Sequence, residues 1–357
     1  MLNIYKLDTE EGIKQYQKVL SSLEVSEPYY LPDYLSVFSG GMQDLICFSF
    51  LSSAGQVIIM PGYLKSIVVD NKVTDYFDLS SPYGYTGPVF SSGTTESDVL
   101  EFWRVVDQWY LDNNVITEFI RFNLSGNQEL YSGNVFSTML NIKGKIIDED
   151  NQWTSFDHKV RKNVNRAKRE NLTSKIFFNE IDEDAISDFH NIYIQTMERT
   201  NAKDQFFYTL EQFKMFINNN RNNAAICTIY FEENPISSEL LLVSDDAIFS
   251  FLGGTNELYF DKRPNDFLKV EALNWARKQG KKYYVLGGGY GFEDGIFKYK
   301  KSFFPNDVVN YYTGRKILNK NVYNKLVEKR NAVRIGAGQS VLDYNDDSFF
   351  PLYNKVN

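Results

Sequence analysis

The sequence predicts an α/β protein built as a tandem repeat of two domains, each with a mixed, mostly antiparallel sheet flanked by helices. The first observation behind this prediction is length, because 357 residues exceed what one ordinary hydrophobic core needs. The second is composition: 43% of the residues are hydrophobic and 24% are charged, which is typical of a globular chain rather than a disordered one. The third is that one order of expected elements occurs twice along the chain.

The first half is expected to begin with a helix and a hairpin. Ser53, Ala54 and Gly55 separate two apolar runs, which indicates a β-hairpin. Pro61 and Gly62 are expected to end its second strand. A helix with its apolar residues on one face then leads to a further strand. The expected elements are a helix at residues 9–20, strands at 44–51 and 56–60, a helix at 97–112 and a strand at 115–122.

The second half shows the same order. Glu233, Asn234 and Pro235 supply the turn of a second hairpin. Cys47 and Cys227 each follow an isoleucine in apolar, strand-like runs at equivalent places, and both are expected to be reduced core thiols. The expected elements are helices at 185–200 and 209–218, strands at 225–231, 239–243 and 247–252, a helix at 265–278 and a closing strand at 282–286.

A basic helix is expected between the halves, within residues 155–175. Its apolar stripe contrasts with a group of four cations: Arg161, Lys162, Arg166 and Arg169. Such a group can bind tRNA or a precursor that bears a pyrophosphate, and the alternative is a solvated helix face. The predicted domains are 1–150, the basic inter-domain helix at 151–175, a second domain at 176–318, and a C-terminal helix and tail at 319–357.

Charge and composition exclude several classes of protein. The net charge is −8 and the isoelectric point is about 5.1, so an anionic partner has to be held by a local basic patch. No cluster of Cys and His has the spacing of a metal site. The N-terminus lacks a signal-peptide pattern, and no run of eighteen apolar residues occurs. We therefore expect a cytoplasmic protein with no transmembrane segment and no metal.

Four segments, taken in order, resemble one family. SPYGYTGPVF at 81–90 is similar to its "PYGYGGP" segment, and KVRKNVNRAKRENL at 159–172 to its basic helix. IYIQTMERTNAKDQFFY at 192–208 is similar to its "T-M-x-R" region, and VLGGGYGFEDGIFKYKKSFFP at 285–305 to its glycine loop and "F-K-x-x-F" ending. The chain thus resembles the Fem-type aminoacyltransferases and the related GNAT-like acetyltransferases over roughly residues 45–304.

This resemblance implies two GNAT-like domains in tandem and transfer of an acyl or aminoacyl group to an amine. The implied co-substrate is acyl-CoA or aminoacyl-tRNA, with no metal and no bound organic cofactor. Two departures leave the donor open. No extended heptad run provides the helical arm that Fem enzymes often carry, and no Q/R-x-x-G-x-G/A loop precedes a helix.

Lys300 is the predicted catalytic residue. It matches the lysine of the family's F-K motif, and a positioned ammonium can stabilise a developing oxyanion. In a strand-like alternation, Lys298 and Lys300 face the same way, so Lys298 is predicted to contact the substrate. The alternative is a solvated lysine cluster on an edge strand.

Two further sets of residues are predicted to bind the substrate. Gly287, Gly288 and Gly289 follow a strand, and their N–H groups can form an anion-binding nest; a plain turn is the alternative. Arg199 matches the arginine of the family's T-x-x-R motif and suits a phosphate or carboxylate. The alternative for Arg199 is a pairing at the end of its helix.

Tyr83, Gly84 and Tyr85 are predicted to form one wall of an acceptor cleft, with a rigid turn as the alternative. The predicted function is that of an N-acyltransferase whose acceptor is an amine of a small-molecule or lipid-linked cell-envelope precursor. This acceptor is either a peptidoglycan peptide or an amino sugar of a surface polysaccharide. The alternatives are a non-catalytic precursor-binding protein or a tRNA-binding protein that retains the fold.

Overall fold

The structure, a computed structural model, describes residues 1–344 and 346–355. It divides the chain into two compact units. The first comprises Met1–Val25, Phe38–Thr138 and Tyr311–Asn357, and the second comprises Ser26–Val37 and Met139–Asn310. Residues 139–150, expected in the first domain, thus lie in the second unit, and residues 311–318 lie in the first.

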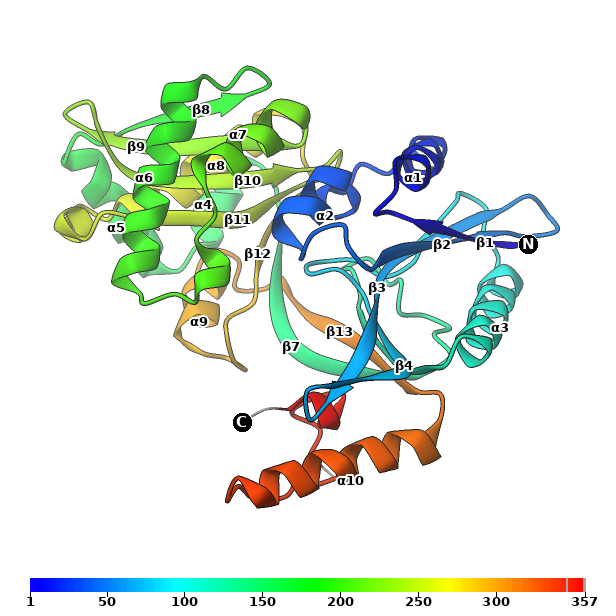
Figure 1. Ribbon diagram of the computed structural model, residues 1–357. Helices are drawn as coiled ribbons and strands as arrows, with labels where there is room; N and C mark the ends of the chain where they lie inside the picture. The colour runs from blue at the N-terminus through cyan, green and yellow to red at the C-terminus, as the bar shows by residue number, and fades with distance from the viewer. Residues whose placement is uncertain (345, 356–357) are drawn as a thin grey trace. The chain divides into compact units, whose positions relative to one another are not determined.

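The first unit is built on a mixed sheet (Figure 1). Its strands follow the order β1-β2-β3-β4-β6-β13, and all neighbours are antiparallel except β4 and β6, which are parallel. The short strand β5 (Val89–Phe90) pairs with β3. The other strands are β1 (Leu2–Lys6), β2 (Leu45–Leu51), β3 (Val57–Val69), β4 (Lys72–Ser80), β6 (Val115–Arg121) and β13 (Val308–Ile317).

Helices cover both faces of this sheet. Thr95 and Asp98 form a capping box that begins α3, which packs into the core through residues such as Phe102. The C-terminal helix α10 packs through Leu326 against Ile116, whose neighbour in the strand belongs to the α3 core. The helices of this unit are α1 (Glu10–Ser22), α3 (Glu96–Asp112), α10 (Lys320–Gly336) and the 3-10 turn η4 (Leu352–Asn354).

The second unit repeats this sheet. Its strands follow the order β8-β9-β10-β11-β12-β7, and again a single parallel pair, β11 and β12, interrupts an antiparallel sheet among the described residues. Cys47 and Cys227 are buried free thiols in the equivalent strands β2 and β9. The strands are β7 (Asn134–Lys145), β8 (Thr173–Phe178), β9 (Ala224–Phe231), β10 (Asn234–Val243), β11 (Ala247–Thr255) and β12 (Tyr283–Gly287).

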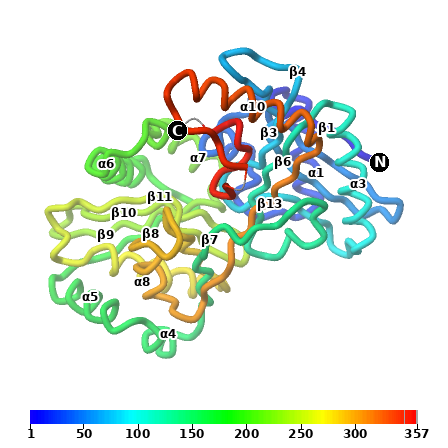
Figure 2. The backbone as a smooth tube through the Cα atoms, turned by 90° about the horizontal axis from the view of Figure 1, so that it is seen from below, coloured from blue at the N-terminus to red at the C-terminus, as the bar shows by residue number. Residues whose placement is uncertain are grey.

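Figure 2 shows strands β8 to β11 of this unit with α6 on one side and α5 on the other. Helix α5 packs with α8, which itself packs on β9 and β10, while α6 packs on β10 and β11. Val160, Val164 and Ala167 of α5 are buried in this core, as the apolar stripe predicts. The helices are α2 (Pro32–Phe38), α4 (Glu149–Ser155), α5 (His158–Arg169), α6 (Glu183–Arg199), α7 (Leu210–Asn219), α8 (Pro264–Lys278) and α9 (Gly295–Lys301). Short 3-10 turns are η1 (Pro28–Tyr30), η2 (Asp204–Phe206) and η3 (Glu257–Lys262).

The tandem repeat predicted from the sequence is confirmed by the identical strand order. One feature of it was not predicted: the last strand of each sheet comes from the other half of the sequence. Strand β7 follows β6 in the chain but pairs with β12, and β13 follows β12 but pairs with β6. Gly144 of β7 lies so close to the ring of Phe304 that a Cβ there would stand 2.4 Å from ring carbons.

Two expectations about the hairpins were wrong. Pro61 and Gly62 do not end the second strand, because β3 continues through them to Val69 and returns as β4. The turn between these strands is Asp70 and Asn71, both with positive φ, which is the backbone of a two-residue hairpin turn. In the second unit β10 begins inside the expected turn, at Asn234.

Candidate active site

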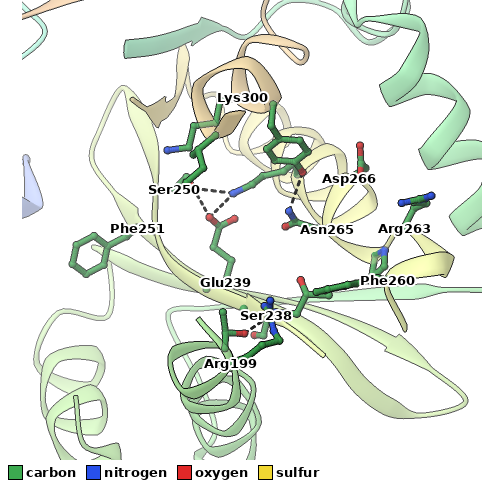
Figure 3. Close-up of a pocket in the computed structure, with 18 residues that line it drawn as sticks. Arg199, Ser238, Glu239, Ser250, Phe251, Phe260, Arg263, Asn265, Asp266 and Lys300 are labelled. Atoms are coloured by element: carbon green, nitrogen blue, oxygen red, sulfur yellow. Dashed lines mark hydrogen bonds and ion pairs between the residues drawn. The ribbon is translucent and has the colours of Figure 1, made fainter. Parts of the chain in front are cut away.

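A cavity of about 530 Å³ lies in the second unit. Its walls come from the end of α6, the middle of β10, the second half of β11, turn η3, the start of α8 and helix α9. Figure 3 shows its lining side chains. Its charged and hydroxyl-bearing lining residues include Arg199, Glu239, Ser250, Arg263, Lys269 and Lys300.

The cavity follows from the end of pairing between the two parallel strands. Strand β12 pairs with β11 only up to Phe249 and Val285, whereas β11 runs on to Thr255 beside β10. In this stretch a Cβ on Gly254 would stand 2.3 Å from the hydroxyl oxygen of Thr196, so glycine lets α6 approach the strand. Parallel strands that separate in this way leave room for a ligand between β11 and the segment after β12.

Helix α9 brings Lys300 to this cavity. The carboxylate of Asp294 accepts the N–H of Phe297 at 2.8 Å and so begins the helix. The Nζ of Lys300 donates to the carbonyl oxygen of Gly288 at 2.7 Å. Burial, and next the nearby charge of Lys269, lower the pKa of Lys300 from 10.5 to about 8. The ammonium is therefore poorly solvated and close to its titration point at neutral pH.

Four polar side chains form a connected cluster at the floor of the cavity. Glu239 and Lys269 are only 5% and 7% exposed, and Lys269 Nζ lies 2.5 Å from Glu239 Oε1. The Oγ of Ser250 donates to the same carboxylate oxygen and accepts from Lys269 Nζ at 2.8 Å. Tyr284 donates to Glu239 Oε2 across 3.3 Å. A charge pair this buried is tolerated because these hydrogen bonds replace water.

The opposite side of the cavity carries cations and an aromatic ring. Arg199 lies over the ring of Phe260, with its Cζ 5.0 Å from the ring centre. Arg263 adopts a left-handed conformation directly before α8, and Figure 3 shows its side chain beside Phe260. Burial raises the pKa of Asp266, which accepts from Asn163 at 3.1 Å. This side suits an anionic group such as a phosphate.

The glycine loop has a local explanation in the structure. A Cβ on Gly288 would stand 2.5 Å from Asn141 Oδ1, and one on Gly289 would stand 2.0 Å from Asp294 Oδ1, while Gly287 has a φ of +75°. The N–H groups that follow the loop, of residues 290 and 291, already donate to the Asp294 carboxylate. Of this loop, the carbonyl oxygen of Gly288 contacts Lys300.

The strand-like alternation expected for residues 297–301 was wrong. These residues form α9, so Lys298 and Lys300 do not face the same way. Lys300 lines the cavity together with Ile296 and Tyr299, and Lys298 is exposed. The physical reason is the N-cap at Asp294, whose hydrogen bonds stabilise a helix that the short alternating pattern does not reveal.

Tyr83, Gly84 and Tyr85 belong to the first unit. The N–H of Tyr83 donates to Ser39 Oγ at 2.9 Å, and Tyr311 donates to the carbonyl oxygen of Gly84 at 3.1 Å. Tyr85 packs edge to face on Tyr311, with ring centres 5.7 Å apart. Tyr83 itself is exposed. The segment is thus a fixed turn that presents one tyrosine to solvent.

Two of the four predicted cations of the basic helix contact other groups of the protein, and two are exposed. Arg161 donates to the carbonyl oxygens of Thr154 and Phe156 at the end of α4. Arg166 lies 3.4 Å from a carboxylate oxygen of Asp261 and 3.8 Å from one of Glu170. Lys162 and Arg169 are exposed. Of the four predicted cations, these last two are the exposed ones.

Sequence reasoning missed the floor cluster and Arg263. Glu239 and Lys269 each interrupt an apolar run, in SSELLLV and FLKVEAL. A charged residue within a buried element indicates that the charge has a partner, and this signal was available in the sequence. Nothing in the sequence shows that the two meet, because they lie thirty positions apart. Arg263 carries a weaker signal, as the residue before the proline that begins a helix.

A comparison with protein families matches residues 158–301 to the acetyltransferase (GNAT) domain. The second unit carries a GNAT acyltransferase domain. This match includes β11, β12, α9 and Lys300, so the cavity lies within the GNAT domain. The acyltransferase class predicted from the resemblance is confirmed. No curated protein matches the chain in sequence.

Solved structures confirm the tandem fold around this GNAT domain. FemX is 11% identical with a TM-score of 0.61, covering 87% of this chain and 98% of that one. L-PGS from Bacillus licheniformis is 12% identical with a TM-score of 0.56, covering 89% and 96%. The C-terminal domain of a putative lysylphosphatidylglycerol synthetase from Agrobacterium fabrum is 10% identical with a TM-score of 0.54, covering 87% and 93%. At these identities the similarity shows the fold.

Within 1–344 and 346–355, no helix has both the length and the apolar character that a membrane span requires. In the same residues, no three or more side chains of His, Cys, Asp or Glu gather as a metal site would need.

Proposed function

We propose that the protein is an N-acyltransferase that moves an acyl or aminoacyl group from acyl-CoA or aminoacyl-tRNA to an amine of a cell-envelope precursor. The observation that carries this proposal is Lys300, a partly buried ammonium in the cavity where β11 and β12 separate. Both kinds of donor are made in the cytoplasm, which is the proposed place of action.

The proposed reaction uses the two sides of the cavity. Arg199 and Arg263 hold the phosphate-bearing part of the donor, and the acyl carbonyl lies against Lys300. Attack by the amine forms a C–N bond and places negative charge on the carbonyl oxygen, which the ammonium of Lys300 stabilises. The tetrahedral carbon then expels the thiol of CoA or the ribose hydroxyl of tRNA. One proton passes from the amine to this leaving group, so the reaction is balanced without a further reactant.

The envelope acceptor is proposed from the similarity of fold to named structures. Two structures with the same fold are named as the C-terminal domain of a putative lysylphosphatidylglycerol synthetase and as L-PGS. The first of these names denotes the making of an aminoacylated lipid. Tyr83 is proposed to contact the acceptor because it is the exposed residue of its turn. Lys162 and Arg169 are proposed to contact an anionic part of a substrate, such as tRNA or a pyrophosphate.

The test is mass-spectrometric detection of product with acyl-CoA donors and, separately, charged tRNA, over a panel of envelope amines. Lys298→Met is a matched control for Lys300→Met, because both lysines lie on α9 and only Lys300 lines the cavity. Transfer that Lys300→Met abolishes and Lys298→Met retains supports the proposal. Donor binding without transfer by a folded wild-type protein contradicts it and favours the non-catalytic alternative.

A further inference from the structure

The floor of the cavity is polar beside Lys300, where the proposed function places the acyl group of the donor. Figure 3 shows Lys300 and Ser250 on the same side of the cavity, with Glu239 beyond Ser250. Lys300, Lys269 and Glu239 all line this one cavity. If the donor carbonyl lies against Lys300, as the proposed function requires, the rest of the acyl group lies against Ser250 and Glu239.

The Glu239 carboxylate has capacity to accept a further hydrogen bond. Its Oε1 is taken by Lys269 and Ser250, whereas the hydrogen bond from Tyr284 to its Oε2 is long, at 3.3 Å. Each carboxylate oxygen can accept about two hydrogen bonds. An amino or hydroxyl group on the acyl chain is therefore a suitable partner for Oε2.

An apolar acyl chain meets the opposite situation. It displaces water from a charge pair without replacing the hydrogen bonds that the water made, and polar groups left unpaired in this way weaken binding by about tenfold to a hundredfold. Ser238 and Thr196 add further polar lining on the same cavity, and both are at most partly exposed.

We propose that Glu239, held in place by Lys269 and Ser250, selects the acyl group of the donor and favours a short chain that carries an amino or hydroxyl group. Apolar chains of the same length are the disfavoured substrates. This proposal rests on the proposed function, since it concerns the donor of the same reaction. Glu239 is the specificity residue, while Lys269 and Ser250 are positioning residues that act through it.

The test compares kcat/KM for donors that differ by one polar group. Butyryl-CoA is paired with 3-hydroxybutyryl-CoA, and propionyl-tRNA with alanyl-tRNA, so that either class of donor gives a ratio. In the wild-type protein we expect the polar member to be preferred by about tenfold or more. In Glu239→Leu/Lys269→Met, which removes both charges together, we expect this preference to disappear or reverse.

A second, milder variant keeps the test valid if the first variant does not fold. Glu239→Gln/Lys269→Met removes the charges but keeps an amide to contact Ser250 and Tyr284, and it is expected to reduce the preference partly. The control is Asp246→Asn/Lys282→Gln, because this ion pair is exposed, joins at 2.9 Å and does not line the cavity. The control should keep the wild-type ratio.

Three outcomes decide the matter. A polar preference that only the cavity variants lose supports the proposal. Transfer by the wild-type protein with an apolar preference, or with a ratio that both cavity variants leave unchanged, overturns the assignment of Glu239 and leaves the proposed function standing. Absence of transfer from all four donors by folded wild-type protein, over the amine panel, overturns both.

Discussion

Replacement of Lys300 by methionine is expected to stabilise the protein while it strongly reduces transfer. Methionine keeps the unbranched apolar stem and removes the charge. The fall of the Lys300 pKa from 10.5 to about 8 corresponds to about 3 kcal/mol by which burial disfavours the charged lysine. Loss of the hydrogen bond to Gly288 costs about 1 kcal/mol. The net expectation is a gain of about 2 kcal/mol at pH 7.

The sign of the pH dependence makes this prediction specific. Below pH 8 the lysine is charged in both the folded and the unfolded protein, so the wild type bears the full penalty. Between pH 8 and 10.5 the folded protein loses this proton before the unfolded chain does, and wild-type stability rises relative to the variant. The penalty falls to about 1 kcal/mol at pH 10, so the difference between the two proteins should nearly vanish there.

Denaturant unfolding of the wild type, Lys300→Met and Lys298→Met at pH 7 and pH 10 measures this difference. Lys298→Met reports what loss of an exposed charge on the same helix does, and we expect about 0.5 kcal/mol or less. Transfer by Lys300→Met should fall by about a hundredfold to a thousandfold. A Lys300→Met protein that is less stable than the wild type at pH 7, or whose gain persists unchanged at pH 10, would refute the reasoning.

Three other changes test other parts of the structure. Lys269→Met alone leaves Glu239 buried without its cation and should destabilise the protein by about 3–5 kcal/mol, whereas Glu239→Leu/Lys269→Met should restore most of this loss; equal unfolding midpoints of the two variants would contradict it. Arg263→Ala should raise the KM for the phosphate-bearing donor about tenfold, with a weaker dependence on salt; an unchanged KM removes Arg263 from the donor site. Gly144→Ala forces a Cβ against Phe304 and should cost about 1–3 kcal/mol in denaturant unfolding, and full stability would show that the ring can move away.

Much of the fold could be predicted because the repeat shows in local sequence patterns such as apolar runs. Apolar runs with Cys47 and Cys227 at equivalent places identify β2 and β9, and both belong to the sheets as expected. Strand β3 could not be delimited because Pro61 lies within it, paired with Cys47 across the ladder, although proline usually ends a strand. Whether a proline is tolerated depends on which side of the strand its nitrogen faces, and register is a property of the sheet.

The sequence could predict a site residue only where that residue belongs to a recognisable motif. Lys300 was found through its motif, and its place in the cavity follows from α9. Its neighbours Glu239 and Lys269 come from different elements, and their meeting depends on how α8 lies on β10. The fold of the glycine loop likewise depends on hydrogen bonds that the backbone N–H groups of residues 290 and 291 donate to the Asp294 carboxylate, and the sequence alone does not show that these groups meet.

The two units share one strand order but differ in the length of the parallel pairing, and the cavity of the second unit lies where its parallel strands separate. In the first unit β4 pairs with β6 from Phe77 to Ser80, and Ser81 extends the contact by bonding to Phe119 and Arg121. A backbone N–H or C=O group that is hydrogen-bonded in this pairing is not available to bind a ligand. In the second unit the pairing stops at Phe249, and the next side chain, Ser250, faces the cavity instead. In the second unit the cavity thus lies directly beyond the shorter of the two parallel pairings.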